Sequence, residues 1–236
     1  MSRTVDATAN PLIPRPTPGV IALIVTLTVA YAAQLLAIRA GAGEFVSALM
    51  LYPDQAALGG RLWQPFTSLL LHDPTSVGHL LNNALMLWLF GTTLEQQRGR
   101  RWLITTFVTC GVAGAVATVF IGGLLHLVMP DTQFDSVWNS PVVGASGGAL
   151  GLLVSWIAIH WGQKINLFLF GLMKAQTFGL VVVAIEILVA LSYDGTSSTS
   201  HFGGMGMGFL IGRGLWPPRN PRKMLAKRQH AKTHDR

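Results

Sequence analysis

Long apolar runs recur along this chain of 236 residues, and they restrict most strongly what it can fold into. A bilayer core of about 30 Å is crossed by about 20 helical residues, because an α-helix rises about 1.5 Å per residue. Segments near that length are predicted to span a membrane at residues 19–39, 78–95, 102–128, 145–161, 175–192 and 201–217. The predicted fold class is therefore an all-α membrane protein, a bundle of six transmembrane helices.

The composition agrees with a membrane location. Half of the residues are apolar and only 11% are charged, whereas charged residues make up about 25% of an average soluble domain. So few charges do not cover a water-facing surface, which excludes an ordinary cytosolic enzyme. The single cysteine, Cys110, excludes a small secreted module held together by disulfides.

Two further apolar stretches do not predict spans. Residues 41–77 are interrupted by prolines and glycines, among them Pro53 and Pro65. The stretch INLFLFGLM, residues 165–173, is too short to cross a bilayer and is predicted to lie at the interface or to dip into it.

The basic residues predict the orientation. Fifteen of the 17 lysines and arginines fall on one side of the six-helix arrangement, and only Arg39 and Arg61 fall on the other. Lysine and arginine are enriched in cytoplasmic loops, so both termini are expected in the cytoplasm. The expected organisation is a cytoplasmic tail (1–18), a membrane domain (19–217) and a basic cytoplasmic tail (218–236). The expected location is the bacterial plasma membrane, as a multi-pass protein.

A net charge of +7 also raises the question of nucleic acid as a partner. The basic tail contains no aromatic residue between its charges, so stacking on bases is not expected. Attraction to anionic lipid accounts better for such a tail. The predicted partners therefore include the lipid bilayer and exclude nucleic acid.

Polar side chains inside predicted spans indicate where function resides, because they are costly in lipid. His79 and Asn83 are four residues apart in the second span and share one helix face. Ser146 lies near the start of the fourth span and His201 near the start of the sixth. Spans two, four and six all enter from the extracytoplasmic side, so these residues are expected at the same membrane depth.

Glycine spacing predicts that the fourth and sixth helices pack closely. Small residues four apart let two helix backbones approach without intervening lipid. If these glycine ridges face each other, Ser146 and His201 come within hydrogen-bonding distance. The glycines with this spacing are Gly147 and Gly151 in the fourth span, and Gly204, Gly208 and Gly212 in the sixth.

These residue types suit nucleophilic catalysis. A serine is a weak nucleophile until a base such as a neutral imidazole takes its proton. Ser146 and His201 are therefore the candidate catalytic residues. Donors from His79, Asn83 and the Ser146 N–H are candidates for stabilising an oxyanion, and Gly144 permits a tight backbone beside the serine.

The motifs resemble those of the rhomboid intramembrane serine proteases. The matching segments are GHLLNNALMLWLFGTTLE (78–95), GASGGALG (144–151) and HFGGMGMG (201–208), with WQPFTSLLLH (63–72) before the second span. The resemblance implies a Ser146/His201 dyad and an oxyanion site of His79, Asn83 and the Ser146 N–H. It also implies single-span transmembrane substrates, cleaved near the extracytoplasmic surface. One departure is Trp63-Gln64, where the family often has Trp-Arg.

Two alternatives stay open. A catalytically silent relative would bind transmembrane helices without cleaving them, although such proteins usually lack the serine or the histidine. A small transporter could line a path with Glu186 and the histidines, but no inverted repeat supports it. Glu186 is interpreted as a hydrogen-bonded structural group, and Glu95 as part of the cytoplasmic rim beside Arg98. No metal or cofactor is expected, because no H-E-x-x-H motif or P-loop is present.

Overall fold

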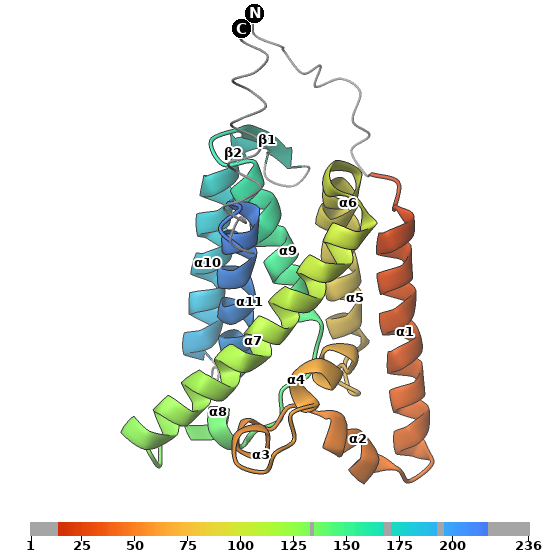
Figure 1. The fold of residues 1–236 in the computed structure, drawn as a ribbon, viewed down its shortest axis with the longest axis vertical. Coiled ribbons are helices and arrows are strands. Elements are labelled where there is room, and N and C mark those ends of the chain that lie inside the picture. The colour runs from red at the N-terminus through yellow and green to blue at the C-terminus, as the bar shows by residue number, and fades with distance from the viewer. Residues whose placement is uncertain (1–13, 133–134, 168–170, 193–195, 217–236) are drawn as a thin grey trace, which may run out of the picture.

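The structure, a computed structural model, describes residues 14–132, 135–167, 171–192 and 196–216. The predicted tails lie almost wholly outside these residues. Helices form a bundle, with one small sheet at an end (Figure 1). In chain order the elements are α1 (Pro18–Arg39), α2 (Gly43–Leu49), α3 (Pro53–Ala57), α4 (Gln64–Thr67), η1 (Ser68–Leu70), α5 (Val77–Met86), η2 (Leu87–Gly91), α6 (Thr92–Arg98), α7 (Arg100–Val128), α8 (Ser136–Asn139), α9 (Ser146–Ile159), β1 (Lys164–Leu167), β2 (Gly171–Lys174), α10 (Ala175–Ser192) and α11 (Thr196–Gly212).

Each of the predicted spans coincides with helix in the described part of the chain. Helices α1, α7 and α10 are each long and apolar enough to cross a membrane, and α9 is a shorter apolar helix. The second predicted span is built from α5 and α6 joined through η2, which is a π-helical turn. The predicted all-α membrane fold class is confirmed, while the number of crossings stays a prediction.

The outer faces of the helices are apolar. Several large apolar side chains on α1, α7 and α10 are more than 60% exposed, an arrangement that a soluble protein avoids. A surrounding bilayer accounts for this exposure, because lipid tails solvate such side chains. Examples are Val29, Leu36, Phe120, Leu188 and Leu191.

The glycine ridges of α9 and α11 face each other, as their spacing predicted. A Cβ atom at Gly204 would overlap the carbonyl group of Gly147, and one at Gly208 would overlap that of Gly151. The Ser155 hydroxyl on α9 donates to the Gly208 carbonyl at 2.8 Å, across the same interface. Helix α7 runs obliquely across this pair (Figure 1). Close backbone contact therefore fixes the relative position of α9 and α11.

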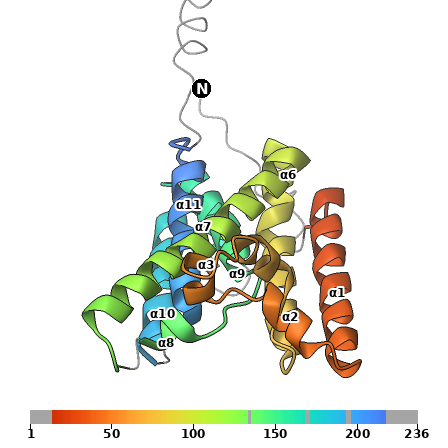
Figure 2. The same ribbon diagram turned by 60° about the horizontal axis from the view of Figure 1, so that its bottom comes forward.

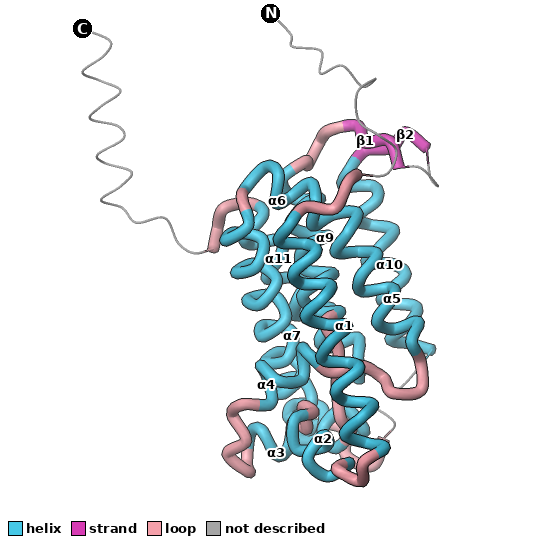
Figure 3. Tube along the Cα trace, turned by 90° about the vertical axis from the view of Figure 1, so that its right-hand side faces the viewer, coloured by secondary structure: helices cyan, strands magenta, loops and turns pink. Residues whose placement is uncertain are grey.

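The two weakly apolar stretches form short elements at opposite ends of the bundle. Residues 41–77 contain the short helices α2, α3 and α4, which lie in the half of the bundle away from the sheet (Figure 1), and Figure 2 turns α2 and α3 toward the viewer. Residues 165–173 were predicted to lie at the interface or to dip into it, and their described residues belong to the antiparallel strands β1 and β2 at the other end (Figure 3). Neither stretch crosses the bundle, and the strands themselves were not predicted.

Basic residues gather at the end of the bundle that carries the hairpin. The start of α1, the end of α6 and the end of α11 lie at this end, whereas α2, α3 and α8 lie at the opposite one (Figure 1). This distribution supports the predicted orientation, in which the basic end faces the cytoplasm. Basic residues on or beside these elements are Arg98, Arg100, Arg101, Lys164, Lys174 and Arg213.

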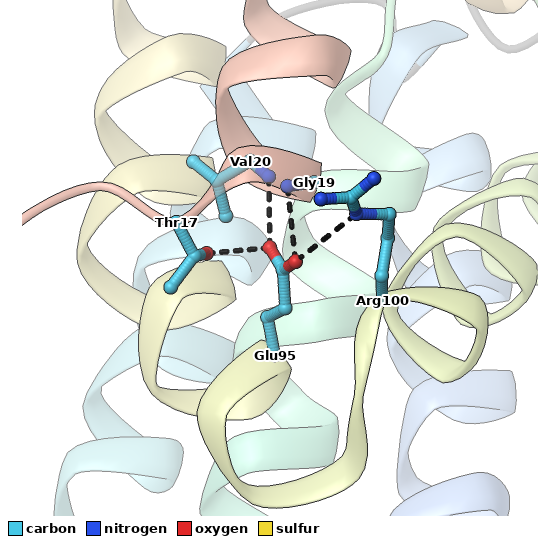
Figure 4. Close-up of polar contacts among 5 residues, drawn as sticks. All are labelled: Thr17, Gly19, Val20, Glu95 and Arg100. Carbon is cyan, nitrogen blue, oxygen red and sulfur yellow. Dashed lines mark hydrogen bonds and ion pairs between the residues drawn. The ribbon is translucent and has the colours of Figure 1, made fainter.

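Glu95 on α6 closes the start of α1 (Figure 4). Its buried carboxylate accepts the backbone N–H groups of Gly19 and Val20, both at 3.0 Å, and the hydroxyl of Thr17. The Arg100 Nε atom lies 3.5 Å from the same carboxylate, so Arg100 takes the place expected for Arg98. Glu95 thus satisfies donors that a helix start leaves without intrahelical partners, and a negative charge suits that end of the helix dipole.

We expect Glu95→Ala to lower the free energy of unfolding by about 2–4 kcal/mol, because hydrogen bonds to a charged group are lost and two N–H groups stay buried without a partner. Thermal unfolding in detergent measures this change. Gln96→Ala is the matched control, since Gln96 is the next residue on α6 and is exposed. An equal loss of stability in both variants would contradict the capping role of Glu95.

Candidate active site

Ser146 and His201 lie within hydrogen-bonding distance in the interior of the bundle. The Nε2 atom of His201 is 2.8 Å from the Ser146 hydroxyl oxygen. Ser146 is the first residue of α9, and His201 is on α11. The facing glycine ridges of these helices account for the contact, because they bring the two backbones together next to both side chains.

The helix that carries His201 begins earlier than its sequence suggests. The sixth span was expected to begin at residue 201, whereas α11 begins at Thr196, so His201 lies in the second turn of its helix. Serine and threonine have weak helix propensity, which hid the first turn. Tertiary contacts compensate: Ser198 and Ser200 are buried, and the Thr199 hydroxyl donates to that of Thr118 on α7 at 2.9 Å.

The second ring nitrogen of His201 contacts a carboxylate. Nδ1 lies 2.8 Å from an oxygen of Glu186 on α10, and the two side chains are only 16% and 13% exposed. Sequence reasoning treated Glu186 as a structural group and missed this contact. The available signal was its chemistry, because Glu186 is the single charged residue of the segment that forms α10.

His79 lies against the backbone that leads into Ser146. Gly144 has φ of +127°, and a Cβ atom there would be 2.8 Å from Nε2 of His79, so this position requires glycine. The Nδ1 atom of His79 accepts the N–H of Asp73 over 3.5 Å. The ring proton of a neutral His79 then belongs on Nε2, the nitrogen that faces Gly144 and the start of α9.

Asn83 is fully buried on α5, one helical turn after His79. Its amide nitrogen is 3.1 Å from Nε2 of His72, and the His72 backbone is itself held by the Gln34 side chain. His72 lies in the connection before α5, where burial and the neighbouring His79 lower its pKa to about 4. A neutral His72 can accept one N–H of Asn83, which leaves the second amide hydrogen of Asn83 for another acceptor.

A cavity of about 340 Å³ joins these groups between α5, α9, α10 and α11. His79, Ser146, Glu186 and His201 all line it, whereas Asn83 does not. Apolar side chains form much of the remaining wall, and the volume lies in the range of pockets for small ligands or side chains. The structure therefore brings five polar residues to one cavity, with Asn82 of α5 as the fifth, while Asn83 does not line it.

This arrangement contains the parts needed for acyl transfer. A hydroxyl is paired with an imidazole, and the imidazole is held through its other nitrogen by a carboxylate. The backbone N–H of Ser146 belongs to the first turn of α9 and has no partner within that helix. An oxyanion formed beside Ser146 would meet this N–H and the ring of His79.

The fold and the site define a helical membrane protein with a serine–histidine pair inside its bundle. Residues 59–218 match the family described as Rhomboid domain. Because this match covers more than half of the chain, the protein belongs to the rhomboid family. Proteases are members of this family, as the names of two relatives state.

Three of the similar proteins come from two bacteria and a plant. Rhomboid protease GluP of Bacillus subtilis is 23% identical over 163 residues, which are 68% of this chain and 27% of that protein. Rhomboid protease AarA of Providencia stuartii is 25% identical over 66% of this chain and 57% of its own length. RHOMBOID-like protein 12, mitochondrial, of Arabidopsis thaliana is 25% identical over 61% of this chain and 44% of its own length. The chain thus matches well under two thirds of each relative.

Proposed function

We propose that this protein is an intramembrane serine endopeptidase that cleaves transmembrane segments of other proteins. The observation that carries the proposal is the 2.8 Å contact between the Ser146 hydroxyl and His201 Nε2 in a cavity within the membrane bundle. Membership of the rhomboid family, which includes serine proteases, supports the same activity.

The reaction begins with attack of the Ser146 oxygen on a peptide carbonyl carbon. His201 takes the hydroxyl proton at Nε2 and then gives it to the leaving amine as the C–N bond breaks. This step leaves an acyl ester on Ser146. A water molecule, deprotonated by His201, hydrolyses the ester and returns the serine to its starting state.

The negative charge of each tetrahedral intermediate falls on the former carbonyl oxygen. The Ser146 N–H, the Nε2–H of His79 and the free amide hydrogen of Asn83 are the proposed donors. For Asn83 to contribute, its amide must reach past the present cavity wall, so we assign the larger share to His79 and the backbone. Losing one such donor typically costs about 2.7–4 kcal/mol of transition-state stabilisation.

The short length of α9 suits cleavage below a membrane surface. Its 14 residues extend about 21 Å, less than the hydrocarbon thickness of about 30 Å. The C-terminal end of α9 is beside the basic hairpin, which we place at the cytoplasmic boundary of the bilayer. Ser146, at the other end of α9, then lies roughly 10 Å below the extracytoplasmic surface. We therefore propose single-span membrane proteins as substrates. The bacterial plasma membrane is the proposed location, although two similar proteins are mitochondrial by name.

Labelling with a fluorophosphonate probe tests the nucleophile directly. We expect the purified wild-type protein in detergent to be labelled on one serine and Ser146→Ala to lose the label, because activated serines react with such probes. Ser192→Ala is the matched control and should keep the label, since Ser192 lies at the exposed end of α10, where its hydroxyl bonds to Leu188.

Cleavage of a single-span substrate in liposomes separates a protease from a silent relative. We expect Ser146-dependent cleavage products from the wild type. A silent helix-binding relative would bind the substrate without cleaving it and would not react with the probe. Labelling or cleavage that persists in Ser146→Ala would contradict the assignment of Ser146 as the nucleophile.

A further inference from the structure

We propose that Glu186 is a positioning residue for His201, so that the site works as a Ser146–His201–Glu186 triad rather than as a dyad. This inference rests on the proposed function. It adds a third residue on another helix, α10, to the pair formed by α9 and α11.

The geometry is that of a chain of three groups. The Glu186 carboxylate is 2.8 Å from His201 Nδ1, and His201 Nε2 is 2.8 Å from the Ser146 oxygen. All three side chains line the same cavity and are largely buried. A base held by a third group through its far nitrogen is the arrangement that generally activates a serine.

The contact selects one tautomer of the imidazole. An ionised carboxylate only accepts hydrogen bonds, so it requires the His201 proton on Nδ1. Nε2 is then free to accept the Ser146 proton. During the reaction the carboxylate also stabilises the imidazolium that forms, while the carboxylate itself keeps no proton. The other imidazole at the cavity, His79 on α5, does not take this place, because its Nδ1 accepts the N–H of Asp73 and its Nε2 lies beside Gly144.

A purely structural role for Glu186 does not account for its position on α10. The buried residues of α10 are Ala175 and Phe178, both in its first turn. The rest of the 18-residue helix is exposed or only half-buried, so most of it faces outward. Glu186 lies eleven positions after Ala175, in the part that packs weakly. An apolar side chain would pack this part of α10 at a lower free-energy cost, since a carboxylate inside a membrane is energetically unfavourable.

Steady-state cleavage kinetics in liposomes tests the proposal. We expect Glu186→Gln to lower kcat about 100-fold or more with KM changed less than about threefold, because the amide does not hold the tautomer or stabilise the imidazolium; loss of the acid in soluble triads costs up to about 10⁴-fold. Glu186→Asp keeps the carboxylate and should regain part of the lost kcat. Leu188→Ala, on the exposed face of the same helix, should behave as wild type.

The ¹⁵N NMR spectrum of the His201 ring provides a readout that needs no cleavage. In wild type we expect a protonated Nδ1 and an unprotonated Nε2 at neutral pH, and a shifted tautomer ratio in Glu186→Gln. The wild-type spectrum decides even if the glutamine variant does not fold. A wild-type proton on Nε2 would overturn the proposal.

The two proposals fail in different ways. Cleavage that does not depend on Ser146 overturns the proposed function. Ser146-dependent cleavage whose kcat is unchanged in Glu186→Gln overturns the triad alone, and leaves Ser146 and His201 as a dyad.

Discussion

Replacing His201 with alanine is expected to lower kcat for transmembrane-substrate cleavage about 10⁴-fold or more, while the helices stay folded. The expected loss is large because the base and the nucleophile act as one unit, so that removing either member removes most of the benefit of both. The ring contacts Ser146 and Glu186 through its two nitrogens, and alanine supplies neither contact.

The measurement is single-turnover cleavage of a single-span substrate in liposomes, with thermal unfolding as the check on folding. His160→Ala is the matched control: His160 follows α9 at the opposite end, where its ring bonds to Gln97 at 3.1 Å. That variant should retain nearly full activity. If His201→Ala kept more than about one tenth of wild-type kcat, His201 would not be the general base.

The meeting of Ser146 with His201 could be predicted from sequence because two independent patterns agree on it. Charge distribution places the starts of the second, fourth and sixth spans on one side, and glycine spacing predicts which helices approach closely. Both patterns reflect constraints that act on whole helices. The structure adds the 2.8 Å contact that these constraints permit.

The sequence was sufficient to assign Glu186 to a helix, but it did not predict that His201 is its partner. Helix α10 is apolar on all sides, so its sequence contains no periodic signal for the face that turns inward. The rotation of α10 is fixed by contacts with α9 and α11, and only these contacts bring Glu186 to His201. Glu95 is a similar case, because its partners at the start of α1 and just before it are 75–78 positions away in the chain.

The predicted ends of elements were wrong where tertiary contacts outweigh the local secondary-structure propensity of the sequence. The turn that contains Ser198 and Ser200 reads as a loop, yet it is helical because its hydroxyls are buried against neighbouring helices. The hairpin of β1 and β2 was equally hidden, since its residues are apolar without a clear alternation. Helix positions were therefore more predictable than the exact ends that place His201 within its helix.

Gly204→Ala is expected to lower kcat about 100-fold and the free energy of unfolding by about 1–3 kcal/mol. A Cβ atom at Gly204 overlaps the Gly147 carbonyl, which is backbone and does not rotate away. Helix α11 must therefore move from α9. Gly147 directly follows Ser146, and Gly204 lies three residues after His201, so the shift lengthens the contact between base and nucleophile.

Gly206→Ala is the matched control for this prediction. Gly206 lies two residues further along α11, is exposed, and has no atom within 4 Å of an added Cβ. Alanine there improves helix propensity by about 0.5–1 kcal/mol, so activity should be unchanged and stability equal or higher. Kinetics and thermal unfolding of both variants separate close packing from a general intolerance of α11 to alanine. Equal effects at the two positions would contradict the role of the glycine ridge in aligning Ser146 with His201.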